Sequence, residues 1–293
     1  MKMKTVKTKR TKLKVGIAFG GGGARGFGHI GVIKAFEEEG ITVDEIAGTS
    51  AGSLIGALYA YGLTSSEMIE VAKTLKKKDI LKNFLPLNNK TDGIQNIIKS
   101  SIGDVHFDEL KTPLTVVATD LNSGNELRIT TGSVAKAVAG SCAFPGVFTP
   151  LDYGKFRLID GGTRNNIPAD ILKTNGCDII ISVDVNASRG SGTQSKGFVD
   201  VFMASLFISM KNNSLNGRLY SNLVIEPDLE KFSPKSTEGY MEMIDEGYKL
   251  TKSLMPQIKQ LLKLEKTPGF WSRLFNRNKQ KILQENEEES VKL

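Results

Sequence analysis

The chain has 293 residues, and a content of 40% apolar and 24% charged residues indicates a globular protein of one large or two modest domains. Its formal net charge of +7 is concentrated at one end, because residues 1–14 carry seven basic side chains and no acid. The rest of the chain holds 32 basic and 32 acidic side chains. This neutral body argues against a nucleic-acid-binding protein, which needs a basic face on its folded domain.

Cysteine and histidine are scarce, with two residues of each type. They are too few for a disulfide framework, a cysteine zinc site or a histidine-rich metal centre, so we expect a reducing compartment and no metal or cofactor. The most apolar stretch, 201–210, is too short to span a bilayer and predicts a core helix. The basic start is followed by a glycine run, which makes a poor signal peptide. We therefore expect a cytoplasmic protein.

Short apolar runs alternate with amphipathic segments along the chain, which predicts an α/β fold with a mainly parallel sheet. Thr64 and Glu67 have the spacing of a helix capping box. The predicted strands are 15–19, 43–47, 114–119, 127–131, 156–159, 179–185 and 223–225. The predicted helices are 27–39, 51–61, 68–77, 133–139, 169–174, 198–210 and 239–264. No repeat or long linker divides the body, and residues 190–197 have the loosest composition inside it.

The first motif is the run GGGGARG at 20–26, between a predicted strand and a predicted helix. Backbone N–H groups of glycines at a helix start converge on an anion, either a phosphate or a reaction oxyanion. Gly21, Gly23 and Gly26 fit the dinucleotide-binding spacing, and Asp44 follows 18 residues later, near the place of a ribose-binding acid. No Lys-Ser/Thr pair follows, so a Walker loop is excluded. The motif alone leaves both functions open.

The second motif is GTSAG at 48–52, between a predicted strand and the helix 51–61. This is the nucleophile-elbow pattern in the strand–turn–helix context that it requires. Such a turn exposes the Ser50 hydroxyl, and its small neighbours avoid clashes. The alternative interpretation is an ordinary serine at a helix N-terminus.

A serine nucleophile needs a base, and neither histidine is well placed for that role. His29 precedes the serine on the first predicted helix, and His106 lies in a polar stretch before most of the sheet. Asp160 ends a predicted strand and is followed by two glycines, which makes it the candidate base, although an ordinary Asp-Gly turn gives the same pattern. Asp120 and Asp184 also end predicted strands and share this ambiguity.

Together, these motifs resemble the patatin-like phospholipase family, whose pattern is a glycine-rich loop with Arg or Lys, a GxSxG elbow and a later Asp-Gly-Gly/Ala. The similarity is to compact bacterial members related to the catalytic part of neuropathy target esterases, and it covers roughly residues 13–228. The motifs here are GGGARG at 21–26, GTSAG at 48–52 and DGG at 160–162. Further similar stretches are VATDLNSGNE at 117–126, AFPGVFTPL at 143–151 and LIDGGTRNNIP at 158–168.

The resemblance implies a three-layer fold with a mainly parallel central sheet flanked by helices, and hydrolysis of phospholipid or lysophospholipid esters without a metal. It implies that Ser50 is the nucleophile and Asp160 its base, with Arg25 positioning the glycine loop or a lipid phosphate. The implied oxyanion-hole donors are Gly21, Gly22 and Gly23. Because an ordinary Asp has a pKa of about 3.9, we expect burial or close contact to make this one a usable base.

One segment departs from the family pattern. Residues 139–142, AGSC, replace a more usual Ala-Ser-small sequence, and we expect them to line the site and affect substrate fit. Two rival functions remain open at this point. One is a nucleotide-binding protein that uses residues 20–26, and the other is a regulatory protein that keeps the fold with little turnover.

The predicted domain organisation is a basic arm over 1–12, a catalytic body over 13–264 and a basic-aromatic tail over 265–293. Residues 266–281 hold five basic side chains, no acid and the only tryptophan, which is typical of an interfacial membrane helix. Packing of its aromatic face on the body is the alternative. We expect residues 1–14 and 266–281 to contact an anionic membrane surface at the inner membrane face, with no nucleic-acid partner.

Overall fold

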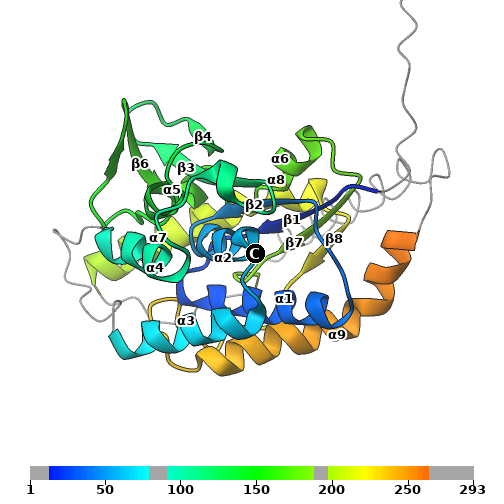
Figure 1. Cartoon of the computed structure of the whole chain (residues 1–293). Helices are drawn as coiled ribbons and strands as arrows, with labels where there is room; N and C mark the ends of the chain where they lie inside the picture. The colour runs from blue at the N-terminus through cyan, green and yellow to red at the C-terminus, as the bar shows by residue number, and fades with distance from the viewer. Residues whose placement is uncertain (1–12, 79–90, 188–196, 264–293) are drawn as a thin grey trace, which may run out of the picture.

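The computed structural model describes residues 13–78, 91–187 and 197–263, in which eight strands form one sheet (Figure 1). The strands are β1 (Val15–Phe19), β2 (Glu45–Thr49), β3 (Leu114–Asp120), β4 (Glu126–Ile129), β5 (Leu151–Tyr153), β6 (Phe156–Asp160), β7 (Ile179–Val183) and β8 (Leu223–Ile225). The helices are α1 (Gly28–Glu38), α2 (Ala51–Tyr61), α3 (Ser65–Lys78), α4 (Asp92–Ile102), α5 (Val134–Ser141), α6 (Ala169–Thr174), α7 (Phe198–Asn212), α8 (Ser214–Tyr220) and α9 (Tyr240–Lys263). Short 3-10 turns cover Gly23–Phe27, Phe107–Glu109 and Gly161–Thr163.

The sheet is parallel on one side and antiparallel on the other. Its strand order is β5-β6-β3-β2-β1-β7-β8, with β4 also paired to β3. Strands β3, β2, β1, β7 and β8 run parallel, whereas β4 and β6 pair with β3 in the antiparallel sense and β5 pairs in that sense with β6. The order reverses at β1, because β2 and β3 lie on one side of it and β7 on the other. In such sheets ligands bind beyond the carboxyl ends of the strands.

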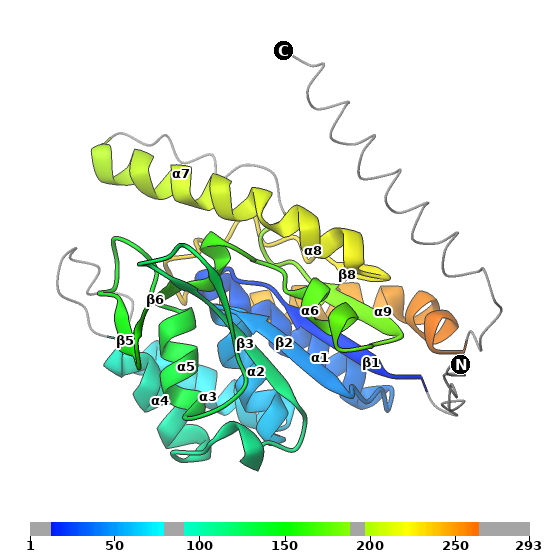
Figure 2. The ribbon, with the colours of Figure 1, turned by 90° about the horizontal axis from the view of Figure 1, so that it is seen from above.

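Helices cover both faces of the sheet, which gives the three expected layers (Figures 1 and 2). Alternate residues of β1 point to opposite faces, so Ile17 and Phe19 enter the larger apolar core while Ala18 enters a smaller one. Helices α1, α2 and α9 pack on the larger core, and α9 lies along α1. Helices α6 and α8 cover the other face, where Ala18 and Ala47 of the sheet belong to the smaller apolar cluster. The expected α/β architecture is therefore confirmed.

The sequence predictions for individual elements hold at most positions. The ranges of β1, β8, α2 and α6 are as predicted, and Thr64 and Glu67 form the reciprocal capping-box hydrogen bonds before α3. The main differences are that β2 lies two residues later than predicted and that α4, α8 and β5 were not predicted. The strand β5 and the helix α8 are short, so their periodicity is weak. The helix α4 is different, because Ile94, Ile98 and Ile102 lie at helical spacing on its buried face and give a signal that is present in the sequence.

Residues 201–210 form a helix, α7, as predicted, but the prediction that this helix lies in the core is wrong. Val201 is 52% exposed and Ile208 is 64% exposed. Of the apolar side chains described in this range, only that of Met210 is buried, at 8%. The reason is that α7 lies along one edge of the molecule and only one side of it meets the body (Figure 2). An apolar run of this length identifies a helix but not its surroundings.

Some predictions fall outside the described residues. These are the basic arm 1–12, the tail 265–293 with its segment 266–281, and most of the loose segment 190–197. A search of the helices in the described ranges found none with the length and hydropathy needed to cross a bilayer.

Candidate active site

Ser50 lies in a sharp turn between β2 and α2 and has an unusual backbone conformation, with φ 51° and ψ −125°. Among the residues that the structure describes, it is the only non-glycine with positive φ. Such a conformation costs about 1–3 kcal/mol and persists only when the surroundings enforce it. The neighbours are glycines for lack of space: a Cβ would lie 2.7 Å from the Gly52 carbonyl oxygen if added to Gly48, and 2.1 Å from that of Phe19 if added to Gly52.

Hydrogen bonds hold this turn on both sides. The Ser50 N–H donates to Ser141 Oγ at 2.8 Å, and the Ser141 hydroxyl, which is fully buried, donates in turn to the Val117 carbonyl. The Ser53 hydroxyl donates to the Ser50 carbonyl at 2.7 Å. Ser141 of the AGSC segment therefore stabilises the turn at Ser50. We expected this segment to line the site and affect substrate fit, and this hydrogen bond was not predicted.

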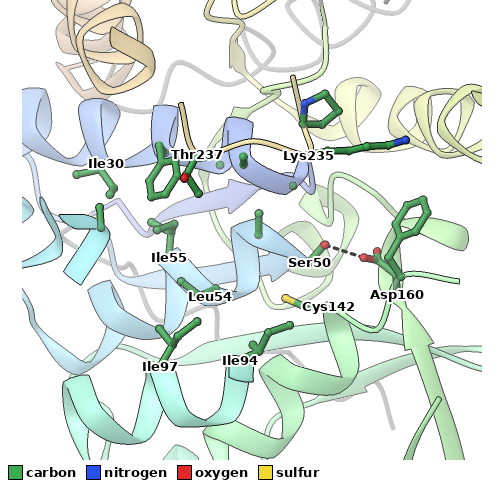
Figure 3. A pocket seen from close by; sticks show the side chains of 18 of the residues that line it. Ile30, Ser50, Leu54, Ile55, Ile94, Ile97, Cys142, Asp160, Lys235 and Thr237 are labelled. Carbon is green, nitrogen blue, oxygen red and sulfur yellow. Dashed lines mark hydrogen bonds between the residues drawn. The ribbon is translucent and has the colours of Figure 1, made fainter. Parts of the chain in front are cut away.

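Asp160 lies at the end of β6, fully buried, beside Ser50 (Figure 3). The Ser50 hydroxyl donates to Asp160 Oδ2 at 2.6 Å, and the Gly162 N–H donates to Oδ1 at 2.8 Å. Sheet register creates this contact, because Thr49 pairs with Val117 of β3 while Asp160 pairs with the next residue of β3, Ala118. The structure thus brings together the two residues that the sequence analysis selected.

Burial changes the acidity of this carboxyl group. Desolvation raises the pKa of Asp160 from 3.8 to about 6, and the hydrogen bonds from the Ser50 hydroxyl and the Gly162 N–H offset part of that rise. The carboxylate is then a stronger base than an ordinary Asp, while still ionised at neutral pH. Of the two expected means of making this carboxylate a usable base, burial raises the pKa, and the hydrogen bond from Ser50 at 2.6 Å provides the close contact.

The other candidate acids and bases lie elsewhere. The Asp120 carboxylate accepts hydrogen bonds from its own turn, including the Ser123 hydroxyl at 2.6 Å, and Asp184 pairs with Arg218. His106 is exposed and caps a 3-10 turn. His29 is fully buried, and its Nε2–H donates to the Gly20 carbonyl at 2.8 Å; burial lowers its pKa to about 4, so it remains neutral.

The glycine loop after β1 has both engaged and free N–H groups. Gly20 N–H donates to Val183, and Gly21 N–H donates to the Asn166 carbonyl at 3.2 Å. No described residue accepts a hydrogen bond from the N–H of Gly22, Gly23 or Ala51, the residue after Ser50. Gly21 therefore does not fit its implied role as an oxyanion donor, because its N–H already has an acceptor.

Arg25 holds a second loop against the glycine loop. It is 7% exposed, and its guanidinium donates to the backbone carbonyls of Phe232 at 2.9 Å and Glu230 at 3.2 Å. A weaker contact joins it to Asn186 Oδ1 at 3.4 Å. Of the two expected roles, the structure fits loop positioning. A lipid phosphate does not fit, since the described contacts of the guanidinium are internal ones.

A largely apolar pocket opens at the Ser50–Asp160 pair (Figure 3). In Figure 3 the pair lies at one end of it, and Ile30 and Ile97 lie toward the other end. Its polar lining side chains are few. Much of the remaining wall consists of aliphatic and aromatic side chains from α2, α3, α4, α7 and the loop after α5, among them Leu54, Ile55, Leu58, Met68, Val71, Ile94, Phe144, Val147, Phe148 and Phe207. A pocket of this composition accommodates a hydrocarbon chain.

The geometry does not support the dinucleotide interpretation of the glycine loop. Asp44 precedes β2 and its carboxylate accepts the Val15 N–H at 2.8 Å, at the amino end of β1. The glycine loop follows the carboxyl end of β1, so a ribose-binding acid at Asp44 would lie at the wrong edge of the sheet.

Several residues near the site were not found by sequence reasoning. Asn165 and Asn166 fix the elbow and the glycine loop through their carbonyls, and Phe207 and Lys235 line the pocket from distant segments. Asn165 and Asn166 belong to the LIDGGTRNNIP stretch, which resembled the family. No local pattern marks Phe207 or Lys235.

The chain is similar in sequence to proteins named for neuropathy target esterase (NTE). An uncharacterised NTE family protein of Mycobacterium tuberculosis is 34% identical over 181 residues, which cover 60% of this chain and 50% of that protein. Neuropathy target esterase sws of Drosophila melanogaster is 35% identical over 194 residues, covering 62% of this chain and 14% of the esterase. The chain thus spans about half the length of the first relative and a small part of the second.

Among solved structures, VipD from Legionella pneumophila shares the fold, with a TM-score of 0.60 at 16% identity over 84% of this chain and 67% of that chain. A family model described as patatin-like phospholipase matches residues 17–173, which run from β1 through most of α6 and include Ser50 and Asp160. Because that match covers more than half of the chain, the protein belongs to the patatin-like phospholipase family.

Proposed function

We propose that this protein is a serine ester hydrolase that cleaves carboxylic esters of phospholipids or lysophospholipids. The observation that carries the proposal is the Ser50–Asp160 hydrogen bond of 2.6 Å at one end of an apolar pocket. The family match and the relative named an esterase support the same reaction class. The pocket favours a substrate with a hydrocarbon chain attached to the ester carbonyl.

In the first step, Ser50 Oγ attacks the ester carbonyl and its proton passes to Asp160 Oδ2. The tetrahedral intermediate then collapses, the alcohol leaves with the proton from Asp160, and the acyl group remains on Ser50. In the second step Asp160 accepts a proton from water, whose oxygen attacks the acyl-enzyme. The fatty acid leaves, and Ser50 regains its proton.

The proposed oxyanion hole consists of the N–H groups of Gly22 and Gly23, with that of Ala51 as a third donor. All three lack an acceptor among the described residues, and Gly23 and Ala51 line the pocket beside Ser50. Fixed donors of this kind contribute about 3–4 kcal/mol each to transition-state stabilisation. Gly21 and Arg25 are proposed to shape this loop and not to bind the oxyanion.

We also propose peripheral contact with an anionic membrane surface through residues 1–12 and 266–281. Lys14 is left out of this contact, because its Nζ pairs with Glu45 and donates to the Asn175 carbonyl at the amino end of the sheet. The exposed Val201 and Ile208 on α7, which also supplies Phe207 to the pocket, add an apolar surface beside the site.

Replacing either member of the dyad tests the function directly. We expect Ser50→Ala and Asp160→Asn to lower kcat on a short-chain aryl ester at least about 10³-fold, since each removes a covalent or proton-transfer step. A fluorophosphonate should label the wild type and not Ser50→Ala.

Wild-type activity in both variants would exclude the dyad. A folded wild type that is never labelled would support a regulatory protein, and thermal shifts with NAD or ATP alone would support nucleotide binding.

The pKa of Asp160 predicts the acid limb of the pH profile. Because the base must be ionised, kcat/KM on a soluble ester should fall about tenfold per pH unit below a midpoint near 6.

The contribution of Asp160 to the free energy of unfolding has the opposite pH dependence. The native carboxyl binds its proton more tightly than the unfolded one, so stability contributed by this group declines as pH rises from about 4 to about 6. Asp160→Asn should therefore melt at a higher temperature than the wild type at pH 7, while a lower melting temperature would contradict the assignment.

Ser141 is proposed to position the nucleophile, and Ser141→Ala tests this role. The variant leaves the Ser50 N–H without its acceptor, so we expect kcat to fall about tenfold or more with KM changed less than twofold. Ser133→Ala is the matched control, because it removes the N-cap of the same helix, α5, at a cost of about 1 kcal/mol without touching the elbow. An equal loss of kcat in both variants would reduce Ser141 to a general structural role.

Deleting residues 1–12 and 266–293 tests the membrane contact. Each basic residue near an anionic surface contributes about 1 kcal/mol, so sedimentation with phosphatidylglycerol vesicles should fall sharply. Hydrolysis of a soluble ester should be unaffected, since the described site contains none of these residues. Unchanged vesicle binding would show that the terminal charge serves another purpose.

A further inference from the structure

Lys235 is the one cationic side chain among the described residues that line the pocket. It lies on the segment between β8 and α9, next to Pro234, and is exposed at its outer surface. The other polar lining side chains are Ser50, Asp160, Thr237 and the buried thiol of Cys142, so a positive charge stands out here. A substrate that consists of a hydrocarbon chain alone would leave this positive charge without a binding partner.

The segment that carries Lys235 is fixed against the glycine loop. The Ala24 N–H donates to the Pro234 carbonyl at 2.9 Å, directly after the proposed donor Gly23. Gly23 approaches so closely that a Cβ on it would lie 2.4 Å from the same carbonyl oxygen. The Arg25 guanidinium donates to the carbonyl of Phe232, which lies two residues before Pro234. The Lys235 backbone is therefore held beside the site of the oxyanion, while its side chain is left to reach a ligand.

No described acid forms an ion pair with the ammonium group of Lys235, whereas Lys231 on the same segment pairs with Glu246 at 3.5 Å. A lysine ammonium is a compact charge with three donors and is a common ligand of phosphate groups. An unpaired ammonium at the mouth of an apolar pocket thus favours a ligand that is both anionic and attached to a hydrocarbon.

The arrangement of the pocket separates the two parts of such a ligand. In Figure 3, Lys235 lies toward the same end as Ser50 and Asp160, and Ile30 lies toward the opposite end. An ester whose carbonyl is at Ser50 would extend its acyl chain along the apolar walls. Its alcohol part would then lie at the end of the pocket that Lys235 lines, where this side chain is exposed to solvent.

We propose that Lys235 binds a phosphate group carried by the leaving alcohol and makes the enzyme prefer acyl esters of glycerol phosphate to neutral acylglycerols. This inference rests on the proposed ester hydrolysis and adds headgroup selection to it. Thr237 lies on the same segment and also lines the pocket, but because it is neutral, it gives no preference for a charged headgroup. Lys235 acts on specificity and takes no part in proton transfer.

The test compares two substrates with one acyl chain, 1-acylglycerol 3-phosphate and 1-acylglycerol, both below their critical micelle concentrations so that aggregate charge has no effect. The quantity measured is the ratio of their kcat/KM values, from fatty acid release. For Lys235→Ala we expect the ratio to fall about fivefold, the upper range for an exposed ion pair, and for Lys235→Glu further still. The matched control is Lys231→Ala, which removes an exposed lysine four residues away and should keep the wild-type ratio.

The outcomes separate this inference from the function on which it rests. An unchanged ratio in Lys235→Ala, or an equal fall in Lys231→Ala, would overturn the headgroup role while leaving ester hydrolysis intact. A wild type that cleaves neither ester and resists fluorophosphonate labelling would overturn the proposed function itself. Added salt should shrink the wild-type ratio toward that of Lys235→Ala, because screening weakens an exposed charge pair.

Discussion

The hydrogen bond between Ser50 and Asp160 depends on β3, which lies between the strands that carry them. These residues are 110 positions apart, and they meet because β2 runs parallel to β3 while β6 runs antiparallel to it. The backbone that follows Asp160 must then pass close to the middle of β3. A Cβ on Gly161 would lie 2.2 Å from the Val117 carbonyl oxygen, so the glycine after the acid is a requirement of this close approach.

The site keeps two unfavourable features at once. Ser50 has a strained backbone, and Asp160 is a carboxylate without a described cationic partner in a fully buried position. Surrounding hydrogen bonds stabilise both features: Ser141 Oγ accepts from the Ser50 N–H, the Ser53 hydroxyl donates to the Ser50 carbonyl, and the Gly162 N–H donates to Asp160. These two features lower stability and give a raised pKa of Asp160 and a Ser50 hydroxyl that faces the pocket, as is common where function requires strain.

Polar side chains behind the glycine loop determine which of its N–H groups remain available. The Asn166 carbonyl accepts the Gly21 N–H, and the Asn186 amide donates to the Gly21 carbonyl. The N–H groups of the next two residues, Gly22 and Gly23, have no acceptor among the described residues, and Gly23 lines the pocket together with Ser50. Arg25 extends the same framework to the segment that carries Lys235, so one set of hydrogen bonds holds both the glycine loop and the residue proposed to bind the headgroup.

The alternation of apolar and amphipathic segments along the sequence was enough to predict the α/β architecture, and the strand–turn–helix context was enough to predict the elbow at 48–52. At strand ends the sequence offered three candidate acids, Asp120, Asp160 and Asp184, among which the double glycine and the family resemblance favoured Asp160. Only the tertiary structure decided which acid of three reaches the serine, which glycine N–H groups are free, and that Ser141 and Lys235 belong to the site. It also placed the apolar helix α7 at the surface, against expectation. The physical reason is that pairing direction, register and burial are properties of segments that meet in space, and local periodicity carries no information about them.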